Sequence, residues 1–159
     1  MKTEVKYDPD SGPFIDIDEI LLADGMSFEE AVLHAAKCYI KAGIPVLPLE
    51  PNSKKLPGGG GINYMSATTK EATVVKWFGE EGKYRGFNIG IGCGIDGGVM
   101  ALDVDAKPVS GTTGLKQLAK IIEKEGQLPE GPRQITPSGG NHYLYRWQSN
   151  AVSSSSKVA

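Results

Sequence analysis

The sequence has few cysteines and no apolar run long enough to span a bilayer. Cys38 and Cys93 are the two cysteines among 159 residues, and their settings and spacing favour buried thiols in a reducing compartment over a disulfide or a zinc site. A catalytic cysteine is the less favoured interpretation. The first four residues lack the apolar core of a secretory signal. We therefore expect a cytoplasmic protein that does not contact membranes.

The sequence also lacks an excess of basic residues. Its 17 lysines and arginines are balanced by 19 aspartates and glutamates, which gives a formal net charge of −2 at pH 7. A chain without a basic surface contacts nucleic acid only locally, or with the help of a partner or a further segment. With 40% hydrophobic and 23% charged residues, the composition is that of one ordinary globular domain.

Two common nucleotide-binding motifs are missing. The sequence contains no GxxxxGKS/T loop, which excludes NTPases of that class for this stretch of chain. Gly90, Gly92 and Gly94 resemble the glycine pattern of dinucleotide-binding folds, but a predicted strand follows them where that motif requires a helix. We therefore reject a dinucleotide site.

Hydrophobic periodicity predicts three helices and five strands. Ser27 and Glu30 form a capping box that begins a helix over residues 27–42, which Gly43 ends. Thr69 can cap a second helix that reaches about residue 80, and a third helix extends from residue 115 to about residue 125. The inward side chains of the second helix are expected to be Val74, Val75, Trp77 and Phe78. The strands are expected over residues 44–49, 87–92, 99–105, 133–136 and 142–147.

The order of these elements, α-β-α-β-β-α-β-β, predicts an α+β fold with mainly antiparallel strands. Residues 94–98 suggest a hairpin between the second and third strands, and residues 137–140 a hairpin between the last two. Two prolines make the first strand an edge or irregular strand, and residues 50–66 read as an unpacked glycine-rich loop. We divide the chain into an N-terminal arm (1–26), one domain (27–150) and a low-complexity tail (151–159). Because the last strand has a free edge, we expect a chain that is cut rather than complete.

Two aspartates lie at the end of the third predicted strand, after an apolar run. Strand side chains alternate between faces, so Asp103 and Asp105 share one face, and their Cβ atoms are roughly 6–7 Å apart. At that distance both carboxylates can bind one hard cation or bridge two, and their mutual repulsion calls for positive charge between them. The alternative is an exposed strand edge with two solvated acids. Asp96, in the preceding turn, is explained as a turn residue.

The segment from Ser138 to His142 has the residues of an anion site. The backbone amides of Ser138, Gly139 and Gly140 can approach an anion without a Cβ atom in the way, and the Ser138 hydroxyl and the His142 imidazole add donors. Together they predict a cradle for a triphosphate. Arg146 follows His142 by four residues and therefore lies on the same side of its strand. The alternatives are a structural histidine and a solvated arginine.

Lys54 and Lys55 lie in the glycine-rich loop, where such pairs usually form a solvated surface patch. Lys54 and its neighbour can also bind phosphates, and we count Lys54 among the candidate nucleotide-binding residues. Tyr143, Tyr145 and Trp147 alternate along the last strand, where core packing explains them better than base stacking.

Taken together, these residues resemble the bifunctional DNA primase/polymerase (Prim-Pol) domain of the archaeo-eukaryotic primase superfamily, which occurs in replication proteins of phages, plasmids and bacteria. The specific part of the resemblance is the pair Asp103 and Asp105 with the SGGxH segment that ends at His142. Residues 45–49, 67–69 and 88–90 support it. The resemblance implies an archaeo-eukaryotic primase-like fold, whose second half is a truncated sheet and helix unit of the RNA-recognition type.

The resemblance also implies roles for these residues. Asp103 and Asp105 would bind catalytic Mg²⁺ or Mn²⁺, and His142, with Ser138, would bind the incoming nucleotide. The reaction would be metal-dependent nucleotidyl transfer in DNA replication, with a DNA template and dNTPs or NTPs as partners. An attached or associated helicase, and the host cytoplasm if a phage encodes the chain, belong to the same expectation.

The chain departs from the family at one point. The family places a third acidic metal ligand beyond the SGGxH strand, and no acidic residue follows His142 here. We therefore expect weak nucleotide and metal binding and poor polymerisation. Two alternatives stay open, namely a catalytically inactive nucleotide- or nucleic-acid-binding accessory module, and a nuclease or phosphatase that uses the same two acids. The SGGNH turn argues mildly against the second, because it suits a triphosphate.

Overall fold

The computed structural model describes residues 25–94, 99–108, 111–136 and 138–147. Its elements are α2 (Phe28–Lys41), β1 (Val46–Leu49), the 3-10 helix η1 (Tyr64–Ser66), α3 (Glu71–Phe78), β2 (Asn88–Ile91), β3 (Val99–Val104), α4 (Gly114–Glu125), β4 (Arg133–Ile135) and β5 (Asn141–Arg146). These strands pair antiparallel, so the α+β class and the predicted order of elements are confirmed. Most of the predicted arm, the predicted tail and the core of the 94–98 turn lie outside the described residues.

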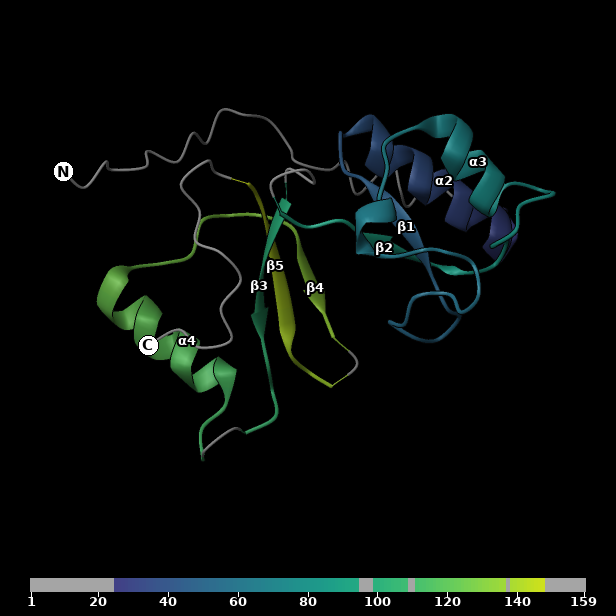
Figure 1. Cartoon of the computed structure of the whole chain (residues 1–159). Coiled ribbons are helices and arrows are strands. Elements are labelled where there is room, and N and C mark those ends of the chain that lie inside the picture. The colour runs from purple at the N-terminus through teal and green to yellow at the C-terminus, as the bar shows by residue number, and fades with distance from the viewer. Residues whose placement is uncertain (1–24, 95–98, 109–110, 137, 148–159) are drawn as a thin grey trace.

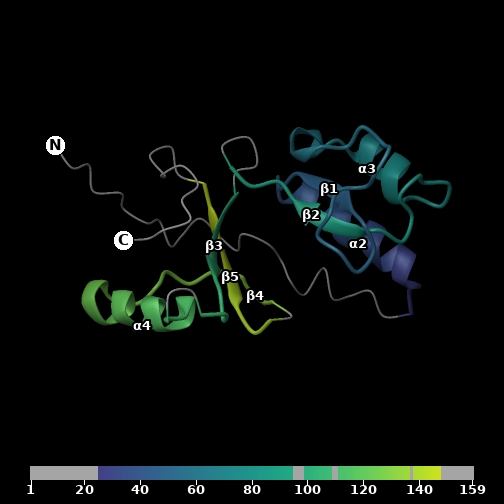
Figure 2. The ribbon, with the colours of Figure 1, turned by 60° about the horizontal axis from the view of Figure 1, so that its bottom comes forward.

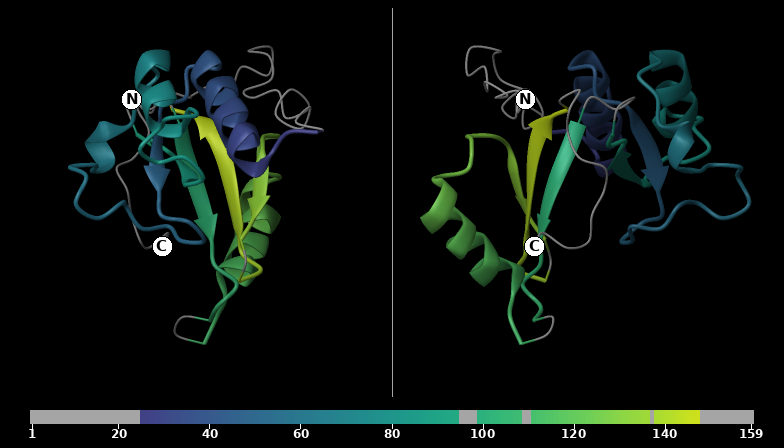
Figure 3. Two further views of the ribbon diagram at one scale, coloured as in Figure 1. Left: turned by 90° about the vertical axis from the view of Figure 1, so that its right-hand side faces the viewer. Right: turned by 60° about the vertical axis from the view of Figure 1, so that its left-hand side comes forward.

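Two small sheets organise the fold. β1 pairs with β2, and β3, β5 and β4 form a three-stranded sheet in that spatial order. Figures 1 and 2 show this second sheet in the middle, with α4 on one side and the unit of α2, α3, β1 and β2 on the other. The left view of Figure 3 looks from that unit toward the sheet and shows α4 behind it. One face of the three-stranded sheet therefore meets a helix, and the other meets the N-terminal unit.

Helix α2 begins as the sequence predicts. The Ser27 hydroxyl accepts a hydrogen bond from the Glu30 amide at 3.2 Å, and the Glu30 carboxylate accepts one from the Ser27 amide at 2.8 Å. Gly43 follows the C-cap with a φ of +79°, a conformation in which a side chain would be strained. Hydrogen bonds from the Ser27 backbone and then from its side chain hold the pKa of Glu30 below its ordinary value of 4.5.

Replacing Ser27 with alanine is expected to lower the free energy of unfolding by about 1 kcal/mol, because the first turn loses its cap. Because the pKa of Glu30 is lower in the folded than in the unfolded state, the Glu30 carboxylate stabilises the fold at pH values above 4.5. This stabilisation is lost as the pH falls through the pKa that Glu30 has in the folded state. Ser27→Ala removes the side-chain bond to Glu30 and keeps the backbone one, so the variant should lose slightly less stability than the parent between pH 5 and the acid limit. Urea titrations at several pH values measure both effects.

Thr69→Ala is the matched control, because Thr69, which was predicted to cap the second helix, does not cap α3 in the structure. Its N-cap is Lys70, with no side-chain capping bond, and the nearby hydroxyl that accepts the Lys70 amide belongs to Thr68, at 3.1 Å. An equal loss of stability in the two variants would contradict the assigned caps. The helix also ends at Phe78, and Val75, expected to face inward, is 41% exposed.

The main core lies between the first two helices and β1. Its buried members are Val32, Ala36, Val46, Val74 and Phe78. The predicted proline-containing edge strand is confirmed, since β1 belongs to a two-stranded sheet and includes Pro48, paired with Ile89. An exposed ion pair between Lys37 and Glu71, at 3.0 Å, adds a link between α2 and α3. Cys38 is buried as expected, whereas Cys93 is exposed, and the two cysteines do not form a disulfide.

The predicted hairpin between the second and third strands is wrong. β2 pairs with β1, whereas β3 pairs with β5. Between the segments of β2 and β3, the described residues form one isolated bridge, from Gly94 to Val99. The physical reason lies before the turn. The Gly92 amide donates to the Pro45 carbonyl at 2.8 Å, and a Cβ atom at Gly92 would stand 2.7 Å from that of Ala67. These contacts hold the end of β2 against the first unit.

The glycine-rich loop is more ordered than its composition suggests. Pro57 is buried, η1 ends the loop, and a Cβ atom at Gly60 would overlap the buried Tyr84 hydroxyl. The expectation of an unpacked segment over residues 50–66 was therefore wrong. Among the described residues, no helix is both long and apolar enough to cross a membrane.

Candidate functional site

The two aspartates lie where β3 leaves the packed part of the sheet. Ala101 and Asp103 are exposed, as is Asp105 just beyond the strand, whereas Val104 on the other face is buried, as strand alternation requires for an open face at this end. At the other end of that face Val99 packs against Ile44 of the N-terminal unit. The face that carries the carboxylates is therefore covered at its Val99 end and open to solvent at its Asp103 end.

The backbone around Asp105 is held from two sides. A Cβ atom at Gly114, the first residue of α4, would lie 2.8 Å and 2.9 Å from the backbone nitrogen and oxygen of Asp105. A Cβ atom at Gly140 would lie 2.6 Å from the Val104 oxygen and 3.3 Å from the Ala106 nitrogen. Two glycines thus let the start of α4 and the start of β5 approach the end of β3. The position of the second aspartate follows from this close packing rather than from a flexible loop.

His142 lies directly across the sheet from Asp103. The register of β3 and β5 pairs these residues, and the His142 Nε2 atom is 3.3 Å from the Asp103 Oδ1 atom. Their side chains are 38% and 61% exposed. Gln134 of β4 pairs with His142 from the other side, so the three residues form one row across the sheet. Gln134 was not singled out from the sequence, because only the strand register reveals it.

The turn before β5 uses its backbone amides internally. The Gly139 amide donates to the Thr136 carbonyl at 2.9 Å, and the Gly140 amide donates to the Thr136 hydroxyl at 3.0 Å. Gly139 has a φ of +84°, which glycine adopts without strain. The Ser138 and Thr136 hydroxyls are 3.1 Å apart, and Ser138 is exposed. The donor that the turn presents outward is thus a hydroxyl, while the amides of both glycines shape the turn.

Arg146 lies on the same face of β5 as His142 but at the opposite end. It pairs with Val99, and Leu144 stands between it and His142 along the face. Four residues of strand separate their Cα atoms by about 13 Å. The structure therefore does not bring Arg146 next to the Asp103–His142 pair.

Lys54 belongs to a loop that is tied to β2. The Asn88 side-chain amide donates to the carbonyls of Glu50 and Ser53, at 3.2 and 3.3 Å. The Glu50 amide in turn donates to the Lys55 carbonyl at 2.9 Å. These bonds close the loop around two exposed lysines. Asn88, a positioning residue for this loop, gave no sequence signal beyond its place in the family-like segment 88–90.

The donor set at the end of β3 fits a hard divalent cation. Asp103, in β3, and Asp105, just beyond its end, are both exposed carboxylates, and oxygen ligands are those that Mg²⁺ and Mn²⁺ prefer. Within the described ranges, no group of three or more His, Cys, Asp or Glu side chains forms a candidate metal site. The described residues thus supply a pair of carboxylates, with room for ligands from water or substrate.

Comparison with known proteins gives one result. A family model described as bifunctional DNA primase/polymerase, N-terminal, matches residues 36–158. No curated protein and no solved structure matches the chain. The family match includes β3, the turn at residues 136–140 and β5, and therefore spans every site residue named above. Because this match covers well over half of the sequence, the chain belongs to the Prim-Pol family of DNA primases and polymerases.

Proposed function

We propose that this chain carries a metal-dependent nucleotidyl-transfer site at the end of β3. The observation that supports it most is the exposed carboxylate pair of Asp103 and Asp105 with His142 3.3 Å from Asp103, in a chain of the Prim-Pol family. Bound Mg²⁺ or Mn²⁺ would supply Lewis-acid stabilisation of the triphosphate and of the attacking oxygen. Asp103 and Asp105 would hold the cations.

His142 would bind the triphosphate of the incoming nucleotide through an imidazole N–H group. Its contact with Asp103 orients the ring, so that the nucleotide and the metal are held next to each other. The Ser138 hydroxyl would donate to the same anion. Gly139 and Gly140 would contribute by shaping the turn, since their amides are already used.

Lys54 would add positive charge from the opposite unit, because its loop is tied in place and its side chain is exposed. Arg146 is a more distant candidate on the same face as His142. An arginine there can contact the nucleic acid backbone more readily than the triphosphate.

The family supports a wider role as well. DNA and nucleotides are the substrates that membership implies. Our proposal is that the chain primes or extends DNA, and that it does so in the replication of a phage or plasmid. In that setting residues 27–150 would form the catalytic domain, and a helicase would be its partner in the host cytoplasm.

One observation favours a second function. The described residues provide two carboxylates and no larger group of candidate metal ligands. A chain that binds a nucleotide through one cation and does not turn it over would be an accessory binding module. Both functions require nucleotide binding that depends on Mn²⁺ or Mg²⁺, and they differ in product formation.

The test measures pyrophosphate release from dNTPs on a primed DNA template with Mn²⁺, beside hydrolysis of the same DNA. Nucleotidyl transfer predicts pyrophosphate that appears with primer extension, and the accessory function predicts dNTP binding with neither product. Hydrolysis of DNA without pyrophosphate would identify a nuclease instead. Absence of any metal-dependent dNTP binding in calorimetry would contradict both proposals.

A further inference from the structure

Two neighbouring side chains on η1 are unusually exposed. Tyr64 and Met65 are 78% and 84% exposed, more than the other exposed large hydrophobic residues of the described chain. Exposing an aromatic ring and a thioether side by side costs the fold part of its hydrophobic stabilisation. Single exposed apolar residues are common, but an adjacent pair at the end of an ordered loop requires another explanation.

The backbone that displays the pair is firmly held. The Asn63 side chain accepts the Met65 amide at 2.8 Å, and the Ser66 hydroxyl accepts the Asn63 amide at 3.0 Å. Just beyond η1, Thr68 and Val46 exchange two backbone hydrogen bonds of 3.0 Å. The two side chains are therefore presented by a capped turn that is anchored to β1. A preorganised surface loses little entropy when a ligand binds.

The charge around this turn has one sign. Residues 51–70 contain Lys54, Lys55 and Lys70 and no aspartate or glutamate, although the whole chain has a net charge of −2. Lys54 and Lys55 are exposed. An exposed aromatic ring inside a locally basic segment matches the two needs of single-stranded nucleic acid, a stacking surface and cations for the phosphates.

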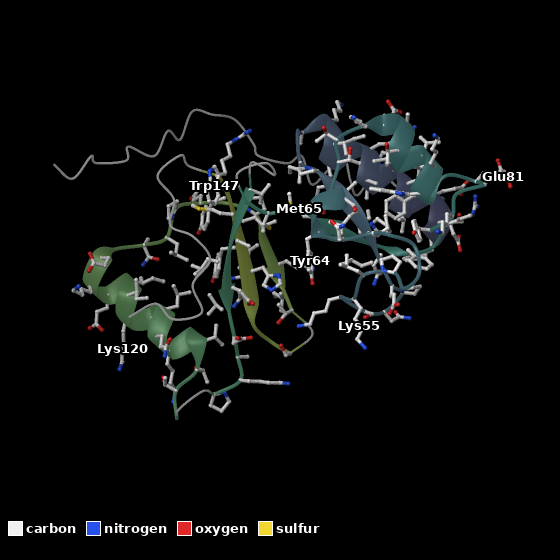
Figure 4. All side chains as sticks on the ribbon, in the orientation of Figure 1. Lys55, Tyr64, Met65, Glu81, Lys120 and Trp147 are labelled. Atoms are coloured by element: carbon white, nitrogen blue, oxygen red, sulfur yellow. The ribbon has the colours of Figure 1, made fainter. Side chains whose placement is uncertain are left out.

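The pair also lies on the relevant side of the molecule. Figure 4 shows Lys55, Tyr64 and Met65 reaching from the N-terminal unit toward the side on which the β3, β5 and β4 sheet lies. That sheet turns the face with Asp103 and His142 toward the same unit, because Val99 and Leu144 on this face pack against Ile44.

We propose that Tyr64 stacks on a base of a single-stranded DNA template, with Met65 against the edge of that base and Lys55 near its phosphate. This inference rests on the proposed function and adds the surface that takes the template. A protein partner fits less well, since two side chains give far less apolar area than a stable protein interface needs. One nucleobase matches the size of the pair.

The test compares binding of a fluorescent oligothymidine to the parent chain and to Tyr64→Ala by anisotropy. We expect Tyr64→Ala to weaken binding by about 5- to 150-fold, the range of one lost base stack, and Tyr64→Phe to keep it. An oligonucleotide with abasic sites should bind the parent more weakly and show little further loss with Tyr64→Ala. Phe28→Ala is the matched control, because Phe28 is a 60% exposed aromatic residue of α2, outside the basic segment.

Salt dependence tests the phosphate part. Lys55→Ala should make the slope of log affinity against log salt shallower by about 0.7, the value for one phosphate contact of a single strand. Tyr64→Ala should leave that slope unchanged. The proposal is overturned if the parent chain does not bind the oligonucleotide at low salt, or if Tyr64→Ala binds it like the parent.

A failure of this inference is distinguishable from a failure of the proposed function. Tyr64→Ala should keep the Mn²⁺-dependent dNTP binding of the parent, which depends on the carboxylates. If Tyr64→Ala instead weakens dNTP binding and leaves oligonucleotide binding intact, the ring contacts the incoming base, and the template assignment is wrong while the nucleotidyl-transfer site stands.

Discussion

Replacing Asp103 and Asp105 with asparagine is expected to abolish Mn²⁺-dependent dNTP binding and to leave the fold intact. Loss of a residue that only orients a metal ligand costs 10- to 100-fold in metal affinity, so loss of both ligands should cost at least about 100-fold. Mn²⁺ titration by electron paramagnetic resonance, with and without dNTP, measures the effect. Each single variant should already lose most of the binding, because one carboxylate leaves the cation underneutralised.

The stability of the double variant separates function from structure. Both aspartates are exposed, and their mutual repulsion disappears with the charges, so the free energy of unfolding should stay within about 0.5 kcal/mol or rise slightly. Glu123→Gln on α4 is the control for the loss of an exposed acid. A double variant that binds Mn²⁺ and dNTP like the parent would exclude the proposed site.

The contact between Asp103 and His142 also contributes little to the stability of the fold. Both side chains are more than one third exposed, and pairs of this kind contribute between about 0 and 1 kcal/mol to stability. The fold therefore does not depend on this contact for its stability. A pairing of an acid and an imidazole at the open end of a sheet is better explained by a ligand that both residues contact.

Local signals predicted the helices and the pairing of β4 with β5, but they did not predict the partner of β2. The capping box of Ser27 and Glu30 acts over three residues, and it is present as expected. The partner of β2 is decided elsewhere, by β1 and by the close approach of Gly92 to Ala67. Such contacts join segments far apart in sequence, and a glycine-rich turn between two strands contains no information about them.

The candidate site shows the same division. Strand alternation was enough to predict that Asp103 and Asp105 are exposed while Val104 between them is buried. That His142 stands across from Asp103 depends on the register of β5, which a turn sequence alone does not determine. The anchoring of the Lys54 loop by Asn88 spans 35 and 38 residues and had no local signal.

Gly140→Ala is the second change with a large expected effect. Gly140 is buried, and an added Cβ atom would stand 2.6 Å from the Val104 carbonyl oxygen and 3.1 Å from the Thr136 hydroxyl. The first neighbour is strand backbone, which cannot move without displacing the end of β3. We expect a loss of about 2 kcal/mol in the free energy of unfolding, as for other overpacked sites, measured by urea denaturation.

Gly140→Ala should also disturb the candidate site, because Gly140 packs against the end of β3, which carries the aspartates, and lies just before His142 in the chain. Val104 is flanked by Asp103 and Asp105, and His142 follows Gly140 by two residues. An added Cβ atom that separates β3 from β5 should lengthen the contact between His142 and Asp103. We expect Mn²⁺-dependent dNTP binding to weaken by at least about tenfold. Gly58→Ala is the control, since its added Cβ atom meets nothing within 4 Å and its φ is not positive. If Gly140→Ala matches Gly58→Ala in both stability and binding, then the turn does not pack against β3 as described, and the joint site of Asp103, Asp105 and His142 loses its structural basis.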